Sequence, residues 1–220
     1  MTGTDGRPTP HEPVLIAFEG LDGTGKSHLT RELSRATGVP RVSTPGPAYD
    51  SLRHELHAAG GLASYLMYLS GCAWAVESAR ASGAPALVAD RYWFSSAVQH
   101  GWNTGLTPGG ALAPAGLHAL LPQPRLTVLL VADREARLQR LARRRPVGTP
   151  LGDSGQAYEQ YWLDCAEVLR DESRTRHSVL VLDTTVSDTA PPLAELLAHP
   201  VVRGIAEAAV GRLAMRGARQ

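Results

Sequence analysis

Residues 14–27 read VLIAFEGLDGTGKS, and this stretch decides the fold. The apolar run Val14–Phe18 has the length and composition of a buried strand, which ends in Glu19-Gly20. Residues 20–27 fit the pattern G-x-x-x-x-G-K-[ST], and a helix is predicted directly after them, over 27–36. In this order, a strand, a glycine-rich loop and a helix N-terminus surround one anion with backbone N–H groups. The stretch therefore predicts a phosphate-binding loop for a nucleoside triphosphate.

The polar side chains of this loop have separate predicted roles. Of the 22 basic residues in the chain, Lys26 is the only lysine, and the other 21 are arginines. An ammonium on a flexible stem would contact the terminal phosphates of ATP, and the hydroxyl of Ser27 would help to hold Mg²⁺. The residues expected to surround ATP are Gly20, Asp22, Gly23, Thr24, Gly25, Lys26, Ser27 and His28.

The composition is that of a globular protein without a strong charge. The chain has 220 residues, of which 43% are hydrophobic and 20% are charged, and its formal net charge is +1. Such a balance provides no global field for binding nucleic acid, so no nucleic-acid partner is expected. Two cysteines, Cys72 and Cys165, cannot build a disulfide framework, and no apolar run is long enough to span a membrane. We therefore expect a cytoplasmic protein without a membrane partner, in which the polar, proline-rich residues 1–13 form a flexible tail.

Predicted strands and helices alternate along the chain. Strands are predicted at 14–18, around Val42, and at 86–89, 126–131 and 179–182. Helices are predicted over 27–36, 51–59, 62–81, 94–100, 134–145 and 158–173, with one or two more between 191 and 216. The glycine- and proline-rich segment 101–116 is expected to be mostly loop. Alternation of this kind indicates parallel βαβ units with helices on both faces of one sheet, so residues 14–220 are expected to form a single α/β domain.

The phosphate-binding loop alone does not identify the reaction, because kinases, GTPases and motors share it. A GTPase would use an Asn-Lys-x-Asp segment to bind its base, and this is excluded because Lys26 is the only lysine. Motors and helicases usually need a longer chain. The sequence also lacks metal-ligand spacings of His and Cys and a Gly-x-Ser-x-Gly segment. These exclusions narrow the possible reactions but do not identify one.

Several short motifs resemble those of the thymidylate kinases, within the nucleoside monophosphate kinase group of P-loop proteins. The matching segments are Phe18–Ser27, Asp90-Arg91-Tyr92 and Ser95-Ser96, and the order of elements agrees along nearly the whole chain. The resemblance implies a P-loop NTPase fold with a five-stranded parallel sheet and a small lid at about residues 143–157. It implies transfer of the γ-phosphoryl group of ATP, with Mg²⁺, to the phosphate of a (deoxy)nucleoside monophosphate in nucleotide biosynthesis. Relatives are commonly dimers, and the apolar helix at 62–76 is compatible with a homodimer.

The resemblance also implies roles for residues at the carboxyl ends of the predicted strands. Arg91 would contact the phosphates, and Asp90 would act on Mg²⁺ through water, with Ser27 as the other metal contact. Asp22 would lie beside the acceptor sugar, and the expected acceptor residues are Asp22, Tyr68, Cys72, Arg91, Ser96 and Gln99.

A catalytic cation is expected from the lid region. Some members of the family have an arginine inside the phosphate-binding loop, whereas here the corresponding positions are Gly23 and Thr24. The candidates are Arg140, Arg143, Arg144 and Arg145. Of these, Arg140 and Arg144 stand one helical turn apart on a shared face of the predicted helix. An arginine aimed at the transferring phosphoryl group can be worth roughly 10³–10⁵ in rate. The expected catalytic residues are therefore Lys26, Asp90, Arg91, Arg140 and Arg144.

The acceptor side departs from the family pattern, although Tyr68 keeps the aromatic position that stacks on the base. Cys72 stands where the family has an arginine that binds the base edge, and Gln99 stands where it has a tyrosine beside the sugar. The turn at 43–46 reads Ser-Thr-Pro-Gly instead of Arg-Glu-Pro-Gly. Because a thiol cannot replace the bidentate hydrogen bonds of arginine, the alternative is an acceptor of specialised metabolism, a non-standard nucleotide or another small phosphorylated molecule. A non-catalytic ATP-binding module is the less favoured alternative.

Overall fold

The computed structural model describes residues 12–59, 61–113, 115–144, 155–173, 178–186 and 190–217. Five strands form one parallel sheet in the order β2-β3-β1-β4-β5. They are β1 (Val14–Gly20), β2 (Arg41–Ser43), β3 (Ala86–Asp90), β4 (Leu126–Val131) and β5 (Ser178–Asp183). The expected α/β fold with a five-stranded parallel sheet is therefore confirmed.

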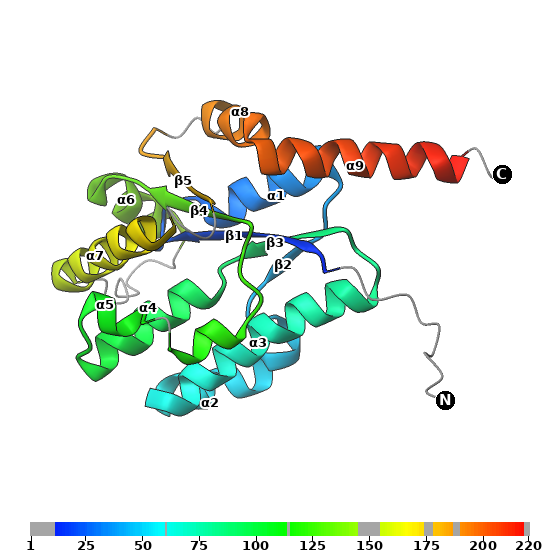
Figure 1. The fold of residues 1–220 in the computed structure, drawn as a ribbon. Coiled ribbons are helices and arrows are strands. Elements are labelled where there is room, and N and C mark those ends of the chain that lie inside the picture. Colours follow the sequence, from blue (N-terminus) through cyan, green and yellow to red (C-terminus); the bar gives the residue numbers. More distant parts are fainter. Residues whose placement is uncertain are drawn as a thin grey trace, which may run out of the picture.

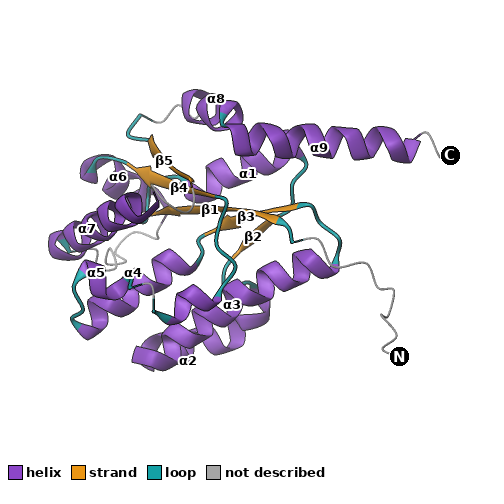
Figure 2. Cartoon of the chain, in the orientation of Figure 1, coloured by secondary structure: helices purple, strands orange, loops and turns teal. Residues whose placement is uncertain are grey.

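Helices cover both faces of this sheet (Figure 1, Figure 2). One face packs against α1 (Lys26–Thr37), α8 (Ala190–Ala198) and α9 (Pro200–Gly217). The other packs against α3 (Gly61–Ala81), α4 (Trp93–Thr104) and α7 (Gln156–Ser173). The remaining elements are α2 (Asp50–Ala59), α5 (Pro108–Ala111), α6 (Arg134–Arg144) and the 3₁₀ turns η1 (Pro47–Tyr49) and η2 (Leu117–Leu120). Among the described residues, no helix is both long enough and apolar enough to cross a membrane.

Each side of β1 supports its own hydrophobic core, because successive side chains of a strand point to opposite faces of the sheet. Leu15 and Ala17 face the core formed with α3, α4 and α7, whereas Ile16 and Phe18 face the core formed with α1, α8 and α9. A strand buried on both sides needs no polar alternation, which explains the continuous apolar run in the sequence. The loop after β1 therefore starts from a fixed position in the centre of the molecule.

The carboxyl ends of β1 and β3 lie side by side, and this brings the two main motifs together. Phe18 of β1 is in register with Asp90 of β3. The phosphate-binding loop therefore begins beside the turn that contains Arg91. Both lie at the edge of a parallel sheet where ligands bind in folds of this kind.

The structure differs from the sequence-based expectation in the segment 101–116, where α4 continues past Gly101 and α5 follows. A Cβ added to Gly101 would lie 2.4 Å from the Tyr161 hydroxyl and 2.5 Å from Cβ of Ala111. This glycine therefore allows α4 to pack closely against α5 and α7 and does not end the helix. Helix α4 ends instead at Gly105, which has the left-handed φ of 71° typical of a helix C-terminus. The prediction of a mostly loop segment was wrong for these residues.

The expected tail at 1–13 and lid at 143–157 fall largely outside the described residues, which do not include 1–11 and 145–154. The two helices that flank the lid segment, α6 and α7, form within two residues of the predicted bounds.

The close contact at Gly71 of α3 gives a test of the packing. A Cβ at this position would lie 2.3 Å from Cβ of Pro45 and 2.8 Å from the carbonyl oxygen of Pro45. We expect Gly71→Ala to force α3 away from the turn after β2 and to lower the free energy of unfolding by about 1–3 kcal/mol. Chemical denaturation measures this change. The matched control is Gly204→Ala in α9, where nothing lies within 4 Å of the added methyl group; it should raise stability by up to about 1 kcal/mol. Equal effects of the two substitutions would contradict the close contact.

Candidate active site

The phosphate-binding loop connects the end of β1 to the start of α1. Helix α1 begins at Lys26, directly after Gly25, whose φ of 89° lies in the left-handed region. Gly23 has a φ of 87°, and a Cβ there would lie 2.6 Å from the carbonyl oxygen of Arg137 in α6. The loop therefore needs glycine at position 23 for its conformation and for the close approach of α6. The N-terminus of α1 points its partial positive charge into the loop, which favours an anion there.

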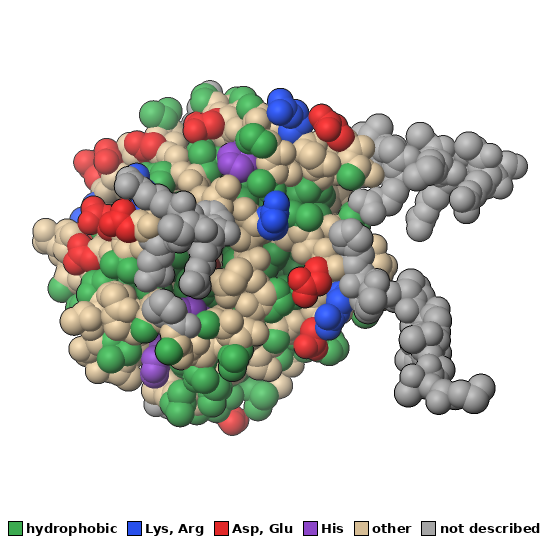
Figure 3. All heavy atoms as spheres, in the orientation of Figure 1, with side chains coloured by type: hydrophobic (Ala, Val, Ile, Leu, Met, Phe, Trp, Pro, Cys, Tyr) green, Lys and Arg blue, Asp and Glu red, His purple; other side chains and the backbone are tan. Residues whose placement is uncertain are grey.

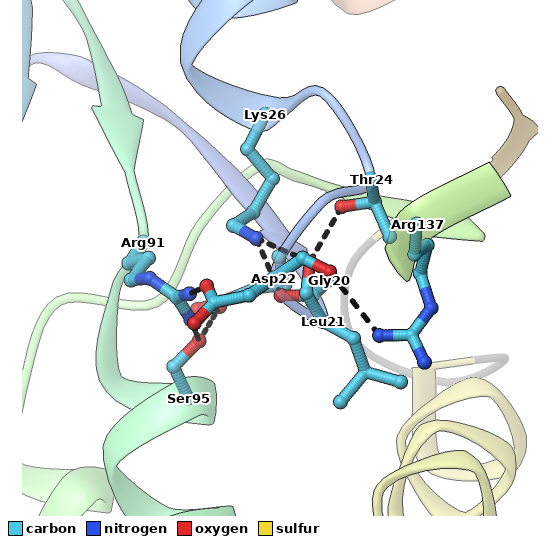
Figure 4. Close-up of polar contacts among 9 residues, drawn as sticks. Gly20, Leu21, Asp22, Thr24, Lys26, Arg91, Ser95 and Arg137 are labelled. Carbon is cyan, nitrogen blue, oxygen red and sulfur yellow. Dashed lines mark hydrogen bonds and ion pairs between the residues drawn. The ribbon is translucent and has the colours of Figure 1, made fainter. Parts of the chain in front are cut away.

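Lys26 lies inside the loop, with its side chain almost fully buried (Figure 4). Its Nζ atom donates hydrogen bonds to the carbonyl oxygens of Gly20 and Leu21, each at 2.7 Å. Burial and the neighbouring positive charge of Arg91 lower the pKa of Lys26 from 10.5 to about 7. The negative charge of an anionic ligand would oppose both effects and raise the pKa of Lys26 again. The lysine is therefore held at the place where a phosphate group gains most from it.

Arg91 has an unusual backbone conformation at the end of β3. Its φ is 70°, the only positive value for a residue other than glycine in the described part of the chain. This conformation costs about 1–2 kcal/mol and needs surrounding contacts to hold it. The Arg91 N–H donates to the carbonyl oxygen of Phe18 at 3.0 Å, and the Thr44 hydroxyl donates to the carbonyl oxygen of Arg91 at 2.9 Å. The side chain is thereby directed toward the phosphate-binding loop, where it pairs with Asp22 and donates to the Ser95 hydroxyl at 3.1 Å.

Glu19, which the sequence analysis did not single out, connects the phosphate-binding loop to the segment that follows β3. Its side chain is completely buried, and Oε1 accepts a hydrogen bond from the Tyr92 N–H at 2.8 Å. Its Oε2 accepts a short hydrogen bond from the Ser95 hydroxyl. Burial raises the pKa of Glu19 from 4.5 to about 7, although these hydrogen bonds and the charge of Arg91 oppose the rise. A carboxylate that ends a fully apolar strand is the sequence signal that could have identified it.

Asp22 has a carboxylate suited to staying charged. Partial burial acts to raise the pKa of Asp22, but the positive charges of Arg91 and Lys26 outweigh it and hold the pKa below its usual value. The side chain is 66% exposed and pairs with Arg91 at the mouth of the site. This carboxylate is therefore a weak base.

The two residues expected to bind Mg²⁺ lie on neighbouring elements. Ser27 is half-buried in the first turn of α1, and Asp90 is buried at the end of β3. The Asp90 carboxylate forms an ion pair with Arg41 of β2. No group of three or more His, Cys, Asp or Glu side chains in the described ranges has the geometry of a metal site. The pair fits Mg²⁺ that is held mainly by triphosphate oxygens, because such an ion takes few protein ligands and keeps several waters.

A cavity of about 440 Å³ opens beside the loop, on the α3 and α4 side of the sheet. Five of the six expected acceptor residues line it: Asp22, Tyr68, Arg91, Ser96 and Gln99. The structure adds further wall residues that were not expected, among them Tyr65, His100, Asn103, Tyr158 and Trp162. The cavity reaches from the phosphate-binding loop to an aromatic and amide-lined interior. A cavity with this combination of aromatic and polar walls is suited to a small ligand.

Cys72 is the expected acceptor residue that the structure does not bring to this cavity. Its side chain is completely buried in the core and is absent from the cavity wall. Burial raises the pKa of the Cys72 thiol, and a hydrogen bond with Thr44 opposes this rise. Thr44, not Cys72, lines the cavity. The expectation that Cys72 contacts the acceptor was therefore wrong, because α3 turns this residue toward the sheet.

Stacked rings form one wall of the cavity. The rings of Tyr65 and His100 are parallel, with centroids 4.4 Å apart. The Tyr65 hydroxyl lies 3.3 Å from Nδ1 of His118, which stacks on Trp93 with centroids 4.5 Å apart. Burial lowers the pKa of His118, which favours the neutral ring, and a neutral ring can accept a hydrogen bond from the Tyr65 hydroxyl at Nδ1. The cavity wall at Tyr65 is therefore supported from behind by the stacked rings of His118 and Trp93.

The expected catalytic arginines of α6 differ in position. Arg140 lies against the phosphate-binding loop, where Nη1 donates to the carbonyl oxygen of Gly23 at 3.2 Å. Its Nη2 donates to the carbonyl oxygens of Thr184 and Thr185 at 2.5 and 3.0 Å. Arg144 is exposed at the end of α6 and is not brought to the loop by any contact in the described residues. Its role in catalysis stays a prediction.

Arg137 is the α6 arginine that the sequence analysis missed. Its side chain is only 1% exposed, and Nη1 donates to the carbonyl oxygen of Asp22 at 3.2 Å (Figure 4). Its Nη2 lies 2.6 Å from Oε2 of Glu159 in α7. The regular three-residue spacing of Arg134, Arg137 and Arg140 was visible in the sequence and would have placed Arg137 beside Arg140.

Comparisons with solved structures place this architecture among known folds. A deoxyadenosine kinase from M. mycoides, with the products dCMP and a flexible dCDP bound, has a TM-score of 0.57 at 14% identity, covering 83% of this chain and 96% of that chain. A thymidylate kinase from Ehrlichia chaffeensis has a TM-score of 0.55 at 20% identity, covering 86% and 97%. A thymidylate kinase from Candida albicans has a TM-score of 0.58 at 19% identity, covering 84% and 91%. The chain has the fold of the nucleoside and nucleotide kinases. No family model and no curated protein matches the sequence. The similarity to these kinases is therefore one of structure.

The lowered pKa of Lys26 predicts that ATP binding takes up protons. At pH 8.5 the buried Lys26 is mostly uncharged, because its pKa in the free protein is about 7. Triphosphate charges would raise that pKa and draw a proton from the buffer. Titration calorimetry in buffers of different ionisation enthalpy should therefore show proton uptake at pH 8.5 and much less at pH 6, where Lys26 is already charged. The control is Lys26→Arg, which stays charged throughout and should bind ATP at pH 8.5 with little uptake. A wild-type binding enthalpy at pH 8.5 that is independent of buffer would contradict the assignment.

Proposed function

We propose that this protein is an ATP-dependent kinase that transfers the γ-phosphoryl group of ATP to the phosphate of a (deoxy)nucleoside monophosphate. The proposal places ATP on the phosphate-binding loop and the acceptor in the adjoining cavity. In-line transfer between two anions needs cations at the junction and little covalent chemistry from the protein. The residues of this chain that meet this need are Lys26 and Arg91.

The observation that carries the proposal is the position of Arg91. Its guanidinium lines the cavity together with Gly20, Leu21 and Asp22 of the phosphate-binding loop. One fixed cation thus borders both the ATP side and the acceptor side. A module that only bound ATP would need no cation directed into a second cavity, which argues against the non-catalytic alternative.

The acid–base properties of the site favour a phosphate as the acceptor over a hydroxyl group. A hydroxyl must lose its proton as it attacks, so a general base with a pKa near neutrality is useful beside it. The carboxylate that faces the cavity is Asp22, whose pKa is held below its usual value. Glu19 has a pKa of about 7, but it is completely buried and does not line the cavity. A phosphate oxygen is already charged at neutral pH and needs only a cation to approach ATP.

In this proposal Mg²⁺ accompanies ATP and neutralises charge on the β- and γ-phosphates. Ser27 would be its direct contact in the first turn of α1. Asp90 would act through water, because its carboxylate is already paired with Arg41. Lys26 would exchange its two backbone carbonyl partners for phosphate oxygens.

Two further parts of the proposal concern the surroundings of the site. Residues 143–157 would close over the phosphates and exclude water during transfer. The expected homodimer stays a prediction, and the exposed apolar side chains Leu62, Leu66 and Trp74 of α3 are compatible with it. In Figure 3, hydrophobic side chains gather over the region of α2 and α3, while acidic and basic side chains are scattered over the rest of the visible face.

The test is formation of ADP with a panel of monophosphates, compared between the wild type and Arg91→Ala. We expect turnover with at least one nucleoside monophosphate. Arg91→Ala should lower kcat about 100-fold or more and leave the Kd for ATP within a few-fold, because its contacts serve the acceptor and the transition state. The control is Arg125→Ala, an exposed arginine at the start of β4, on the opposite edge of the sheet. Loss of ATP affinity with unchanged kcat in Arg91→Ala would contradict this role.

Gln99 gives a prediction about the sugar of the acceptor. It lines the cavity, and its Nε2 donates to Oδ1 of Asn103 at 3.0 Å on the next turn of α4. A polar side chain in place of a tyrosine leaves room for a ribose 2′-hydroxyl. We expect uridine monophosphate to be accepted nearly as well as deoxyuridine monophosphate, and Gln99→Tyr to lower kcat/KM for the ribonucleotide alone, by about 10-fold or more. Thymidine monophosphate should be a modest substrate. Efficient turnover restricted to thymidine monophosphate in the wild type would show that this pocket has been misinterpreted.

The alternative acceptor, a non-standard nucleotide or another small phosphorylated molecule, is favoured by one specific feature of the cavity. Apart from Asp22 and Arg91 at its mouth, the described lining includes His100 and the tyrosines as its ionisable side chains, and no arginine reaches its interior. A base edge in the interior would therefore meet hydroxyl, amide and imidazole groups instead of a guanidinium. Clear ATP binding without turnover of any common nucleotide would support this alternative.

A further inference from the structure

The phosphate-binding loop is held from outside by hydrogen bonds to its backbone. Nη1 of Arg137 donates to the carbonyl oxygen of Asp22 at 3.2 Å, and Nη1 of Arg140 donates to the carbonyl oxygen of Gly23 at 3.2 Å. Both arginines belong to α6 and stand three residues apart, so they lie on one face of this helix. Two consecutive carbonyl groups of the loop thus contact two consecutive arginines of that face.

The next carbonyl group of the loop is held in the same way from another element. The hydroxyl of Thr184, directly after β5, donates to the carbonyl oxygen of Thr24 at 2.8 Å. The same hydroxyl lies 3.0 Å from the carbonyl oxygen of Val131 at the end of β4. Thr184 also accepts a hydrogen bond from Arg140, through its own carbonyl oxygen. Three carbonyl groups in a row, at residues 22–24, therefore accept hydrogen bonds from the α6 and β5 side.

The direction of these carbonyl groups fixes the direction of the amides that follow them. In a planar trans peptide the C=O of one residue and the N–H of the next point in opposite directions. Carbonyl groups at 22–24 that point toward α6 and Thr184 turn the N–H groups of residues 23–25 the other way. Figure 4 shows Arg137 and Lys26 on opposite sides of the loop backbone. The N–H of Thr24 already makes a long hydrogen bond of 3.3 Å to the carbonyl oxygen of Leu21, which a phosphate oxygen could replace.

The hydrogen bond from Arg137 to the loop requires a guanidinium that is almost completely removed from water. A fully buried arginine loses its hydration, and it is stable only when its charge is paired. Glu159 of α7 supplies that charge, with Oε2 at 2.6 Å from Nη2 of Arg137. Nε of Arg137 is buried without a hydrogen-bond partner among the described residues. The side chain of Arg137 therefore packs α6 against the loop and also donates a hydrogen bond to the loop backbone, which an apolar side chain could not do.

We propose that Arg137 and Arg140, with Thr184, are positioning residues that set the phosphate-binding loop in its anion-binding form before ATP arrives. They hold the carbonyl groups of residues 22–24 outward and so keep the following amides directed at the triphosphate. The inference rests on the proposed function only in that the loop binds ATP. It gives Arg140 a role that differs from the expected one, since its guanidinium acts on the loop backbone instead of the transferring phosphoryl group. Gly23 completes the arrangement, because only glycine lets the Arg137 backbone approach this closely.

The test measures equilibrium binding of inorganic tripolyphosphate with Mg²⁺, a probe that contacts the loop without base or sugar. Two loop variants remove the contacts from α6: Arg140→Lys, and the double substitution Arg137→Met/Glu159→Gln, which removes the buried pair together and so avoids an unpaired charge. Thr184→Val removes the third contact independently. We expect each to weaken tripolyphosphate binding about tenfold, with the KM for the acceptor and the Tm close to wild type.

The control is Arg134→Met, on the same helix. Arg134 lies 3.7 Å from Oε2 of Glu159, and no hydrogen bond to the loop is made by its side chain in the described residues. Its tripolyphosphate affinity should match the wild type. Three results would overturn the proposal: unchanged affinity in all loop variants, a lower kcat with unchanged affinity, or parallel losses of Tm and acceptor binding. A wild-type protein that binds neither ATP nor tripolyphosphate would overturn the proposed function itself, and the inference with it.

Discussion

The buried carboxylate of Glu19 is the interaction on which the arrangement of the site depends. It ends the central strand β1 and accepts hydrogen bonds from the backbone of Tyr92 and the hydroxyl of Ser95. Both residues follow Arg91 closely in the chain. The left-handed backbone of Arg91 is itself held by hydrogen bonds with the carbonyl oxygen of Phe18 and the hydroxyl of Thr44. In the sequence, Glu19 is followed directly by Gly20, the first residue of the phosphate-binding loop. This buried side chain thus links the phosphate-binding loop to the segment that contains Arg91.

Two positively charged side chains, Lys26 and Arg91, determine which ligands the site favours. Lys26 and Arg91 are close enough that the charge of Arg91 lowers the pKa of Lys26. The carboxylates of Asp22, Asp90 and Glu19 offset part of the repulsion between these two cations, and a bound polyanion would offset it further. The packing of the sheet and the hydrogen bonds around Glu19 keep Lys26 and Arg91 in place despite their repulsion. The charges of Lys26 and Arg91 therefore favour an anionic ligand at this site.

The sequence predicted the fold well because the decisive signals are local. The strand at 14–18, the glycine spacing of the loop and the position of Lys26 each follow from neighbouring residues, and the structure places them as expected. Contacts between elements distant in the sequence were missed. Gly101 was interpreted as a helix end because its close neighbours, on α5 and α7, lie far along the chain. Cys72 was expected at the acceptor because the pattern gives a position on α3 but not the rotation of that helix. Arg137 was overlooked because burial of an arginine is improbable until its partner Glu159 is known.

The central claim is that the phosphoryl group passes from ATP to another phosphate. Phosphorus NMR of a reaction containing the protein, Mg²⁺, ATP and a nucleoside monophosphate observes that transfer directly. The account predicts that the γ-phosphate signal of ATP falls while signals of ADP and of a new nucleoside diphosphate rise at the same rate, with little inorganic phosphate. Release of inorganic phosphate at the rate of ATP loss, with the monophosphate signal unchanged across a broad panel of acceptors, would contradict it.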